Sequence, residues 1–212
     1  VDVTIIEKGE RPLAQFDPDL VDSLVDRTRE LGIDLETSTE LNSIEEGGEG
    51  GFVVSVTSAG VSRSIEADMV VHGAGRVPNT ADLDLETAEI RFGPQGIEDK
   101  DNLQSVSNPA VYAAGDVAAT GTPPLSPVAI EEGRILAHNL LNDEQQKPDY
   151  GPVATVVFTV PALASVGLGE GDARRQGLQF HTRSGDRSDD NSMKKVGEKC
   201  ARYKVLVEEP SG

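Results

Sequence analysis

The first 35 residues alternate between strand-like and helix-like segments, and this alternation limits the folds that the chain can adopt. Residues 1–6 form a β-branched run, and residues 33–35 are a second strand-like segment. Between them, Asp17 can cap a helix whose first position suits Pro18, and apolar residues recur at steps of three and four until Gly32. A strand–helix–strand order predicts a parallel α/β unit.

The remaining pattern predicts a small antiparallel meander, further strands and a long helix. Polar, glycine-rich residues 45–51 and the tight turn at 58–60 indicate hairpin loops. Residues 181–198 are polar and show little periodicity. We expect strands at 52–57, 61–65, 68–72, 110–114, 155–159, 164–168 and 203–207, and helices at 127–141 and 170–176.

Both ends of the sequence read as folded structure. A strand begins at Val1, and the strand predicted at 203–207 is followed only by a short turn. We therefore expect this chain to be a piece of a longer protein.

The charge balance excludes several classes of partner. Asp and Glu total 37 against 19 Lys and Arg, which gives a formal charge of −18. Such a field repels nucleic-acid phosphates and anionic lipid head groups, so we expect neither as a partner. Apolar runs stay well short of the roughly 18 residues of a spanning helix. The acidity indicates a halophilic protein, whose self-repulsion is screened by salt; an ordinary acidic surface is the alternative.

Cysteine and histidine usage indicates neither a disulfide nor a metal site. Cys200 is the only cysteine, which fits a reducing, cytoplasmic location. Lys199 and Arg202 could lower its pKa, although an inert thiol is the simpler interpretation. The three histidines are scattered along the sequence, and we interpret them as structural or exposed.

Three positions are candidates for contact with a nucleotide. Glu7 is an acid at the tip of a parallel strand, where a carboxylate can accept hydrogen bonds from ribose hydroxyls and repel a 2′-phosphate. Gly75 follows a predicted strand and permits close approach of a flat cofactor. Asp116 follows Gly115 at the tip of another predicted strand and can hold ribityl or ribose hydroxyls. Each position also has a structural alternative. Glu7 would then be a solvated carboxylate, Gly75 part of an ordinary tight turn, and Asp116 a residue that caps a turn.

An ordered set of segments resembles a known family. The segments are residues 3–7, 16–18, 75–80, 111–116, 127–134, 155–159 and 164–168. In this order and spacing, the set resembles the FAD-dependent pyridine nucleotide–disulfide oxidoreductases, which include lipoamide dehydrogenase, glutathione reductase and mercuric reductase.

The resemblance implies an α/β fold in three parts. Residues 1–79 would form a partial Rossmann-like NAD(P)-binding domain with a β-meander, without its first strand and glycine turn. Residues 80–150 would form the C-terminal part of an FAD-binding domain, and residues 151–212 would begin an α+β dimer-interface domain.

The resemblance also implies cofactor roles for individual residues. Glu7 would bind the NAD ribose, Leu41 the adenine end and Gly75 the dinucleotide, while Asp116 would hold the ribityl chain of FAD. Four consecutive residues would line the flavin ring: Pro124, Leu125, Ser126 and Pro127.

By the same resemblance, the redox cysteine pair and the catalytic His–Glu pair of the family lie outside this sequence, so we expect the chain alone to be inactive. The parent protein would be a homodimer that moves electrons between NADH, FAD and a small disulfide, dithiol or lipoyl substrate. Glu7 favours NAD over NADP and hence a dihydrolipoamide dehydrogenase. A glutathione-type or mercuric reductase is the alternative, and a non-catalytic nucleotide-binding fragment is an alternative from another class.

Overall fold

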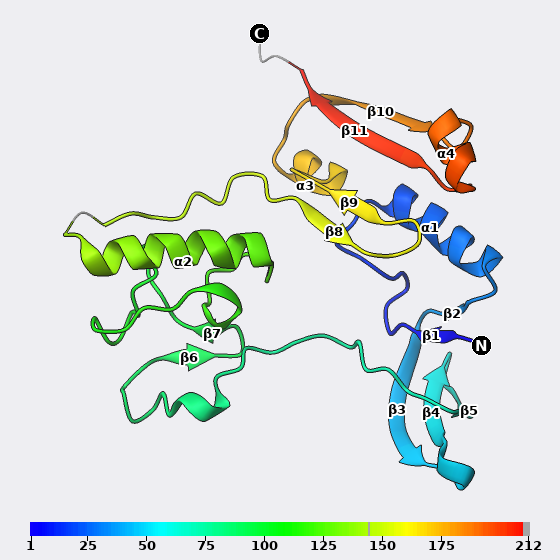
Figure 1. Cartoon of the computed structure of the whole chain (residues 1–212), viewed down its shortest axis with the longest axis horizontal. Coiled ribbons are helices and arrows are strands. Elements are labelled where there is room, and N and C mark those ends of the chain that lie inside the picture. Colours follow the sequence, from blue (N-terminus) through cyan, green and yellow to red (C-terminus); the bar gives the residue numbers. More distant parts are fainter. Residues whose placement is uncertain (144, 210–212) are drawn as a thin grey trace. The chain divides into compact units, whose positions relative to one another are not determined.

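The computed structural model describes residues 1–143 and 145–209 and divides the chain into two compact units (Figure 1). The first unit joins Val1–His72 to Val156–Gly212, and the second is Gly73–Thr155. The fold is mixed α/β, as the sequence predicts. The boundaries expected at 79/80 and 150/151 stay a prediction.

The first unit opens with the predicted parallel α/β unit. Strand β1 (Thr4–Ile6) pairs in parallel with β2 (Asp34–Glu36) through the crossover helix α1 (Pro18–Glu30). Asp17 caps α1 by accepting a hydrogen bond from the Asp19 amide at 3.1 Å. The apolar face of α1 is buried through Val21 and Leu24, and this face holds the helix against the strands.

A three-stranded antiparallel meander follows. It is formed by β3 (Thr39–Glu46), β4 (Phe52–Ser58) and β5 (Val61–Ala67), with β4 in the centre. Val54 and Val56 are buried on alternate positions of β4. The β4–β5 turn places both Ala59 and Gly60 at positive φ, the geometry of a tight hairpin.

The C-terminal segment of the first unit is a hairpin with short helices. Its elements are β8 (Thr155–Val157), β9 (Leu163–Ser165), α3 (Glu170–Arg175), β10 (Phe180–Asp186), α4 (Asn191–Val196) and β11 (Arg202–Glu208). Strand β10 pairs with β11 from Phe180 opposite Glu208 to Asp186 opposite Arg202. The polar stretch 181–198 therefore begins as a strand, because backbone hydrogen bonds to β11 hold residues 181–186 despite their weak apolar periodicity.

An ionic cluster attaches this hairpin to α1. The Lys204 side chain on β11 is 8% exposed and lies within 2.9 Å of carboxylate oxygens from three residues: Asp17, Asp19 and Glu170. One ammonium thus joins β11, the N-terminus of α1 and the start of α3.

The second unit packs short strands and turns against one long helix. Its elements are η2 (Ala81–Leu83), β6 (Phe92–Gly93), β7 (Gly96–Ile97), η3 (Gly115–Val117) and α2 (Ser126–Leu141). Helix α2 confirms the helix predicted at 127–141. The buried cluster of this unit consists of Leu85, Ile90, Ile97, Ala113 and Ala118.

Two predicted strands are wrong. Residues 68–72, which lie within the described ranges, form no strand, and Met69 and Val71 are 75% and 83% exposed. Residues 110–114 contribute only an isolated bridge, between Tyr112 and Gln104. Both segments have the apolar composition of a strand, but a strand also needs a neighbour to accept its backbone hydrogen bonds.

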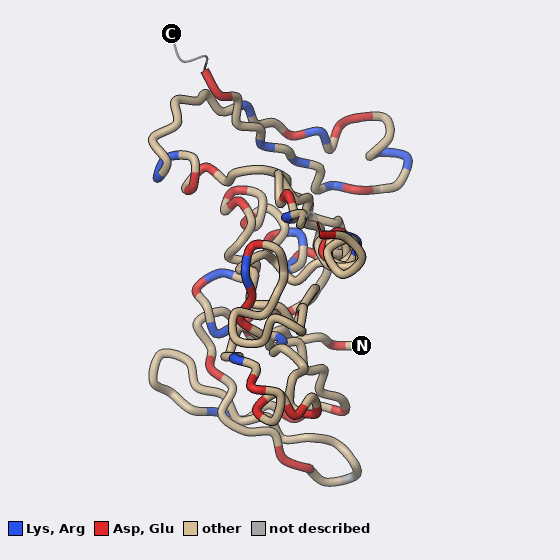
Figure 2. Tube along the Cα trace, turned by 90° about the vertical axis from the view of Figure 1, so that its left-hand side faces the viewer, with Lys and Arg blue, Asp and Glu red and all other residues tan. Residues whose placement is uncertain are grey.

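Charged residues are distributed along both units, with acidic positions more numerous than basic ones (Figure 2). Of the helices in the described ranges, none has the length and apolarity of a membrane span.

Candidate functional site

Glu7 lies at the tip of β1, as predicted. Its amide donates to the Glu36 carbonyl at 2.8 Å and its carbonyl accepts from the Thr39 amide at 3.0 Å, so the backbone is fixed between β2 and β3. The Oε1 atom accepts a hydrogen bond from the Gly9 amide at 2.6 Å. The residue is half-buried, and its carboxylate can therefore accept further hydrogen bonds from hydroxyl groups.

Leu41 belongs to the same unit and lies on β3, opposite Val56 of β4. The pairing of β3 with β4 is irregular between Leu41 and Ser43. Leu41 is 43% exposed. Two residues before Leu41 on the same strand, the Thr39 amide donates to the Glu7 carbonyl. Strand β3 therefore connects the exposed Leu41 side chain to the tip of β1.

The other predicted residues lie in the second unit. Gly75 has φ +101, and a Cβ added there would meet nothing within 4 Å. The glycine is thus explained in this structure by its left-handed backbone. The next residue, Arg76, places a guanidinium nitrogen 3.7 Å from Oδ2 of Asp116, so the two predicted segments that contain Gly75 and Asp116 are close together.

Asp116 lies in the short turn η3, after the left-handed Gly115 (φ +74). Its side chain is 46% exposed. A Cβ on Gly115 would lie 3.2 Å from the Cβ of Ala129 in α2, tighter than ordinary packing. Glycine therefore lets the turn lie directly against the first turns of the helix.

Residues 124–127 lead into α2. Leu125 is the residue before the helix, with extended backbone and no side-chain cap, and Ser126 and Pro127 open the first turn. Pro124, Ser126 and Pro127 are exposed, and Leu125 is half-buried. The first amides of a helix have no partner within it, so this end can donate hydrogen bonds to a ligand.

Glu132 is a site residue that the sequence analysis missed. Its exposure is 0%, Oε2 accepts from the Gly115 amide at 2.5 Å, and Oε1 accepts from the Tyr150 hydroxyl at 2.7 Å. Burial and the Glu132 carboxylate raise the pKa of Tyr150 above its usual value. The helical spacing contained a signal, because Glu132 falls on the same face as Val128, Ile135 and Asn139.

Asp99 adds a second carboxyl group to this region. Burial, followed by the negative charges of Glu132 and Asp101, raises the pKa of Asp99 to about 6. Its Oδ2 atom is inaccessible and has no hydrogen-bond partner. At neutral pH the folded protein therefore holds an ionised group in a place that disfavours its charge.

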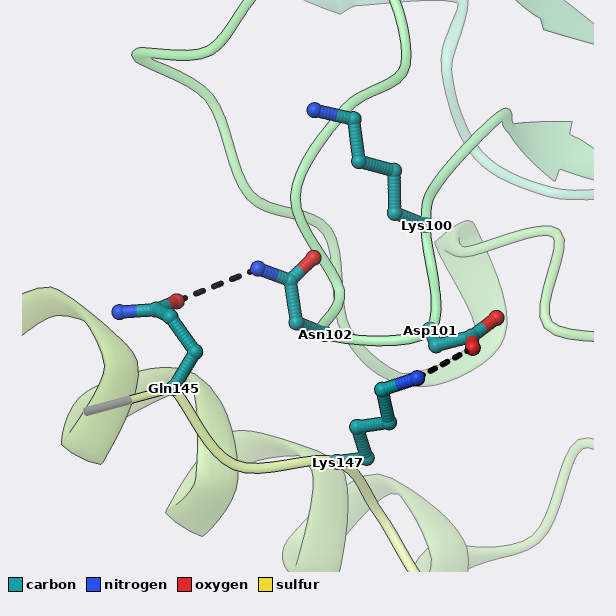
Figure 3. Close-up of a pocket in the computed structure, with 5 residues that line it drawn as sticks. All are labelled: Lys100, Asp101, Asn102, Gln145 and Lys147. Atoms are coloured by element: carbon teal, nitrogen blue, oxygen red, sulfur yellow. Dashed lines mark hydrogen bonds and ion pairs between the residues drawn. The ribbon is translucent and has the colours of Figure 1, made fainter.

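A pocket of about 460 Å³ in the second unit lies among polar side chains (Figure 3). Lys147 points toward Asp101 with 2.6 Å between Nζ and Oδ2, and the Asn102 amide donates to Gln145 at 3.2 Å. Lys100 completes the lining. None of the eight predicted cofactor residues lines this pocket.

Cys200 is the remaining sequence candidate. Burial and Glu198 raise the pKa of the Cys200 thiol, and the thiol donates to the Ser23 carbonyl at 3.5 Å. The flanking basic residues therefore do not activate it. Over the described ranges, no group of three or more His, Cys, Asp or Glu side chains is arranged to hold a metal ion.

Comparison with known proteins identifies the family. Residues 1–133 match the family model described as pyridine nucleotide-disulphide oxidoreductase. The chain belongs to this family. The resemblance inferred from the ordered motifs is therefore confirmed.

Several curated relatives are similar in sequence. A protein named "Uncharacterized 19.7 kDa protein in mercuric resistance operon" from Staphylococcus aureus is 41% identical over 127 residues, 60% of this chain and 71% of the relative. Mercuric reductase of the same species is 34% identical over 85% of this chain and 32% of its own length. The dihydrolipoyl dehydrogenase of Staphylococcus aureus is 33% identical, over 84% of this chain and 37% of its own length. The chain thus spans about a third of the length of these two enzymes.

Solved structures share the fold. The flavoprotein disulfide reductase RclA from Escherichia coli superposes with a TM-score of 0.83 at 24% identity, over 98% of this chain and 46% of that protein. LpdA from Mycobacterium tuberculosis superposes with a TM-score of 0.83 at 26% identity, over 100% of this chain and 45% of that protein. The chain therefore shares its mixed α/β fold with these two proteins.

Proposed function

We propose that this chain supplies part of two cofactor sites in an enzyme that moves electrons between NADH, FAD and a disulfide or dithiol. Family membership supports the reaction class. The observation that favours the two sites most is that neither Glu7, directly after β1, nor Asp116, in the turn η3, is buried. Each carboxylate can accept hydrogen bonds from sugar-like hydroxyl groups.

The residues around Asp116 fit the ribityl side of FAD. The carboxylate is exposed, Gly115 keeps the turn close to α2, and the helix begins with uncapped amides at Ser126. Pro124, Leu125 and Pro127 offer apolar contact to a flat ring. FAD, when bound, supplies the two-electron chemistry between a nicotinamide and a disulfide. The residues of this chain would bind and orient it.

Glu7 fits the adenine ribose of NADH. The Gly9 amide holds one carboxylate oxygen at 2.6 Å and fixes its direction. A 2′-phosphate at the same place would face the negative charge, which disfavours NADPH. Leu41 would pack against the adenine end.

Among family members, we propose an NADH-linked dihydrolipoamide dehydrogenase with a lipoyl substrate, because Glu7 favours NAD. The second candidate is a mercuric or glutathione-type reductase, and the relative from a mercuric resistance operon supports it. In either case residues 151–212 would begin the interface of a homodimer in the cytoplasm. A cysteine pair encoded upstream and a His–Glu element encoded downstream would separate both from a non-catalytic nucleotide-binding protein.

The test is the dinucleotide preference of the 212-residue chain, measured by NMR titration with NADH and NADPH. Glu7→Arg should shift the ratio of dissociation constants toward NADPH by roughly ten-fold, or about 1.4 kcal/mol. Glu10→Arg makes the same charge change three residues later, in the exposed loop after β1, and should leave the ratio within about two-fold. Equal ratios in wild type and Glu7→Arg would refute the assignment.

A further inference from the structure

Glu132 is an unusual residue for the interior of a small protein unit. A glutamate is rarely buried completely unless its charge is compensated, because removing a carboxylate from water is costly. Here the exposure is 0%, and its two hydrogen-bond partners are neutral donors, a backbone amide and a phenol. A leucine would fill an ordinary position on the buried face of α2, so the carboxylate calls for a specific explanation.

The two partners come from segments on either side of the helix in sequence. Gly115, before α2, donates its amide to Oε2 at 2.5 Å, and Tyr150, after α2, donates its hydroxyl to Oε1 at 2.7 Å. Hydrogen bonds to an ionised acceptor are shorter and about twice as strong as neutral ones. One side chain therefore ties the η3 turn and the linker after α2 to the same point on the helix.

The bond to Gly115 acts at the residue directly before Asp116. Gly115 is left-handed (φ +74), and the space beside Ala129 admits no larger residue without movement. The turn is thus held by close packing on one side and by the Glu132 carboxylate on the other. The Asp116 side chain stays 46% exposed, so the turn is fixed while its carboxylate remains accessible to a ligand.

We propose that Glu132, supported by the Tyr150 hydroxyl, is the positioning residue that fixes the Gly115–Asp116 turn and thereby the direction in which Asp116 meets its ligand. The role in cofactor binding rests on the proposed function of Asp116. Glu132 acts through the turn and does not itself contact the ligand.

The experiment compares four variants of the full 212-residue chain by NMR. Glu132→Leu removes the acceptor, Glu132→Gln keeps one oxygen for Gly115, and Tyr150→Phe removes only the second bond. Glu131→Gln is the matched control, because Glu131 is the neighbouring residue on α2 and is paired with Arg134 at the surface. The readouts are hydrogen exchange and chemical shift of the Gly115 amide and the ¹³C shift of the Asp116 carboxyl.

In the wild type, the Gly115 amide should be shifted downfield and exchange slowly. Glu132→Leu should raise its exchange rate by ten-fold or more and move the Asp116 signal, Glu132→Gln should restore most of the protection, and Tyr150→Phe should give an intermediate value. Glu131→Gln should match the wild type. A Gly115 amide that exchanges equally fast in wild type and Glu132→Leu, with both folded, would overturn the proposal. If Glu132→Leu fails to fold, a Gly115 amide that exchanges in Tyr150→Phe at the wild-type rate overturns it.

Titration with FAD separates this inference from the proposed function. FAD should move the Asp116 signal in wild type, with roughly ten-fold weaker affinity in Glu132→Leu. If FAD leaves the Asp116 signal unchanged in every protein, the proposed function fails, while the exchange data still decide whether Glu132 fixes the turn.

Discussion

Substitution of Asp99 by Asn should stabilise the protein at neutral pH and not in acid. The Oδ2 atom of Asp99 is buried without a partner, and burial together with Glu132 and Asp101 raises the pKa of this carboxyl to about 6. The folded state therefore binds the proton more tightly than the unfolded state, whose pKa is near 3.8. Stability contributed by the protonated form is full below about pH 4 and is lost as pH rises through about 6.

The size of the effect follows from the two pKa values. A rise of about two in pKa corresponds to about 3 kcal/mol of preference for the neutral form. Asp99 is only partly buried, so solvent screening reduces this, and we expect a gain of about 1–2 kcal/mol for Asp99→Asn at pH 7.5. Asn keeps the shape of the side chain and removes the charge facing Glu132.

Urea unfolding of wild type and Asp99→Asn at pH 7.5 and pH 4 measures this difference. The stabilisation should be present at pH 7.5 and close to zero at pH 4. Asp101→Asn serves as the control on the same loop. The hydrogen bond from Lys147 lowers the pKa of Asp101, so replacing the Asp101 carboxylate should lower stability at neutral pH. A destabilised Asp99→Asn at pH 7.5, or the same difference at both pH values, would show that the carboxyl has an unrecognised partner.

Three other perturbations test separate parts of the structure. Lys204→Met should lower the free energy of unfolding by about 2 kcal/mol, since it removes the buried ammonium that the carboxylates of Asp17, Asp19 and Glu170 share. The hydrogen bonds of Lys204 and then Arg174 lower the pKa of Glu170 to about 2. Wild type should therefore lose stability as pH falls from 4.5 toward 2, and a Lys204→Met variant that loses it equally would contradict the cluster. Gly96→Ala should lower the free energy of unfolding in urea by roughly 2–3 kcal/mol, because Gly96 has φ +118 and a Cβ would overlap the Val117 carbonyl. Gly48→Ala is the control: a Cβ there would lie in open space, so the free energy of unfolding should change by less than about 0.5 kcal/mol. If the net charge of −18 reflects a halophilic protein, the melting temperature should rise from dilute to molar KCl, and a flat or falling curve would count against that interpretation.

The sequence predicted the elements whose stability is local. Helix α1 has its cap at Asp17, its apolar face at Val21 and Leu24 and its stop at Gly32, and the structure confirms each. The parallel pairing of β1 and β2 followed from the strand–helix–strand order, and the structure confirms it. Family membership was likewise predictable, because seven short segments kept their order and spacing.

The errors concern features that depend on distant partners. Residues 68–72 have the composition of a strand but no strand neighbour in the described structure, whereas β10 is a strand mainly because β11 pairs with it. The helical spacing places Glu132 on the buried face of α2, but its hydrogen bonds depend on the positions of Gly115 and Tyr150, which periodicity alone does not give. The roles of Glu7 and Asp116 stay predictions for the same reason, since a ligand contact is not encoded in a single segment.

The most direct test of the two proposed cofactor sites is a ¹³C-carboxyl NMR spectrum of the chain, titrated separately with NADH and with FAD. We expect NADH to move the Glu7 signal and FAD the Asp116 signal, each with little effect on the other. Signals that respond to neither cofactor would contradict the claim that these two carboxylates bind nucleotide hydroxyl groups.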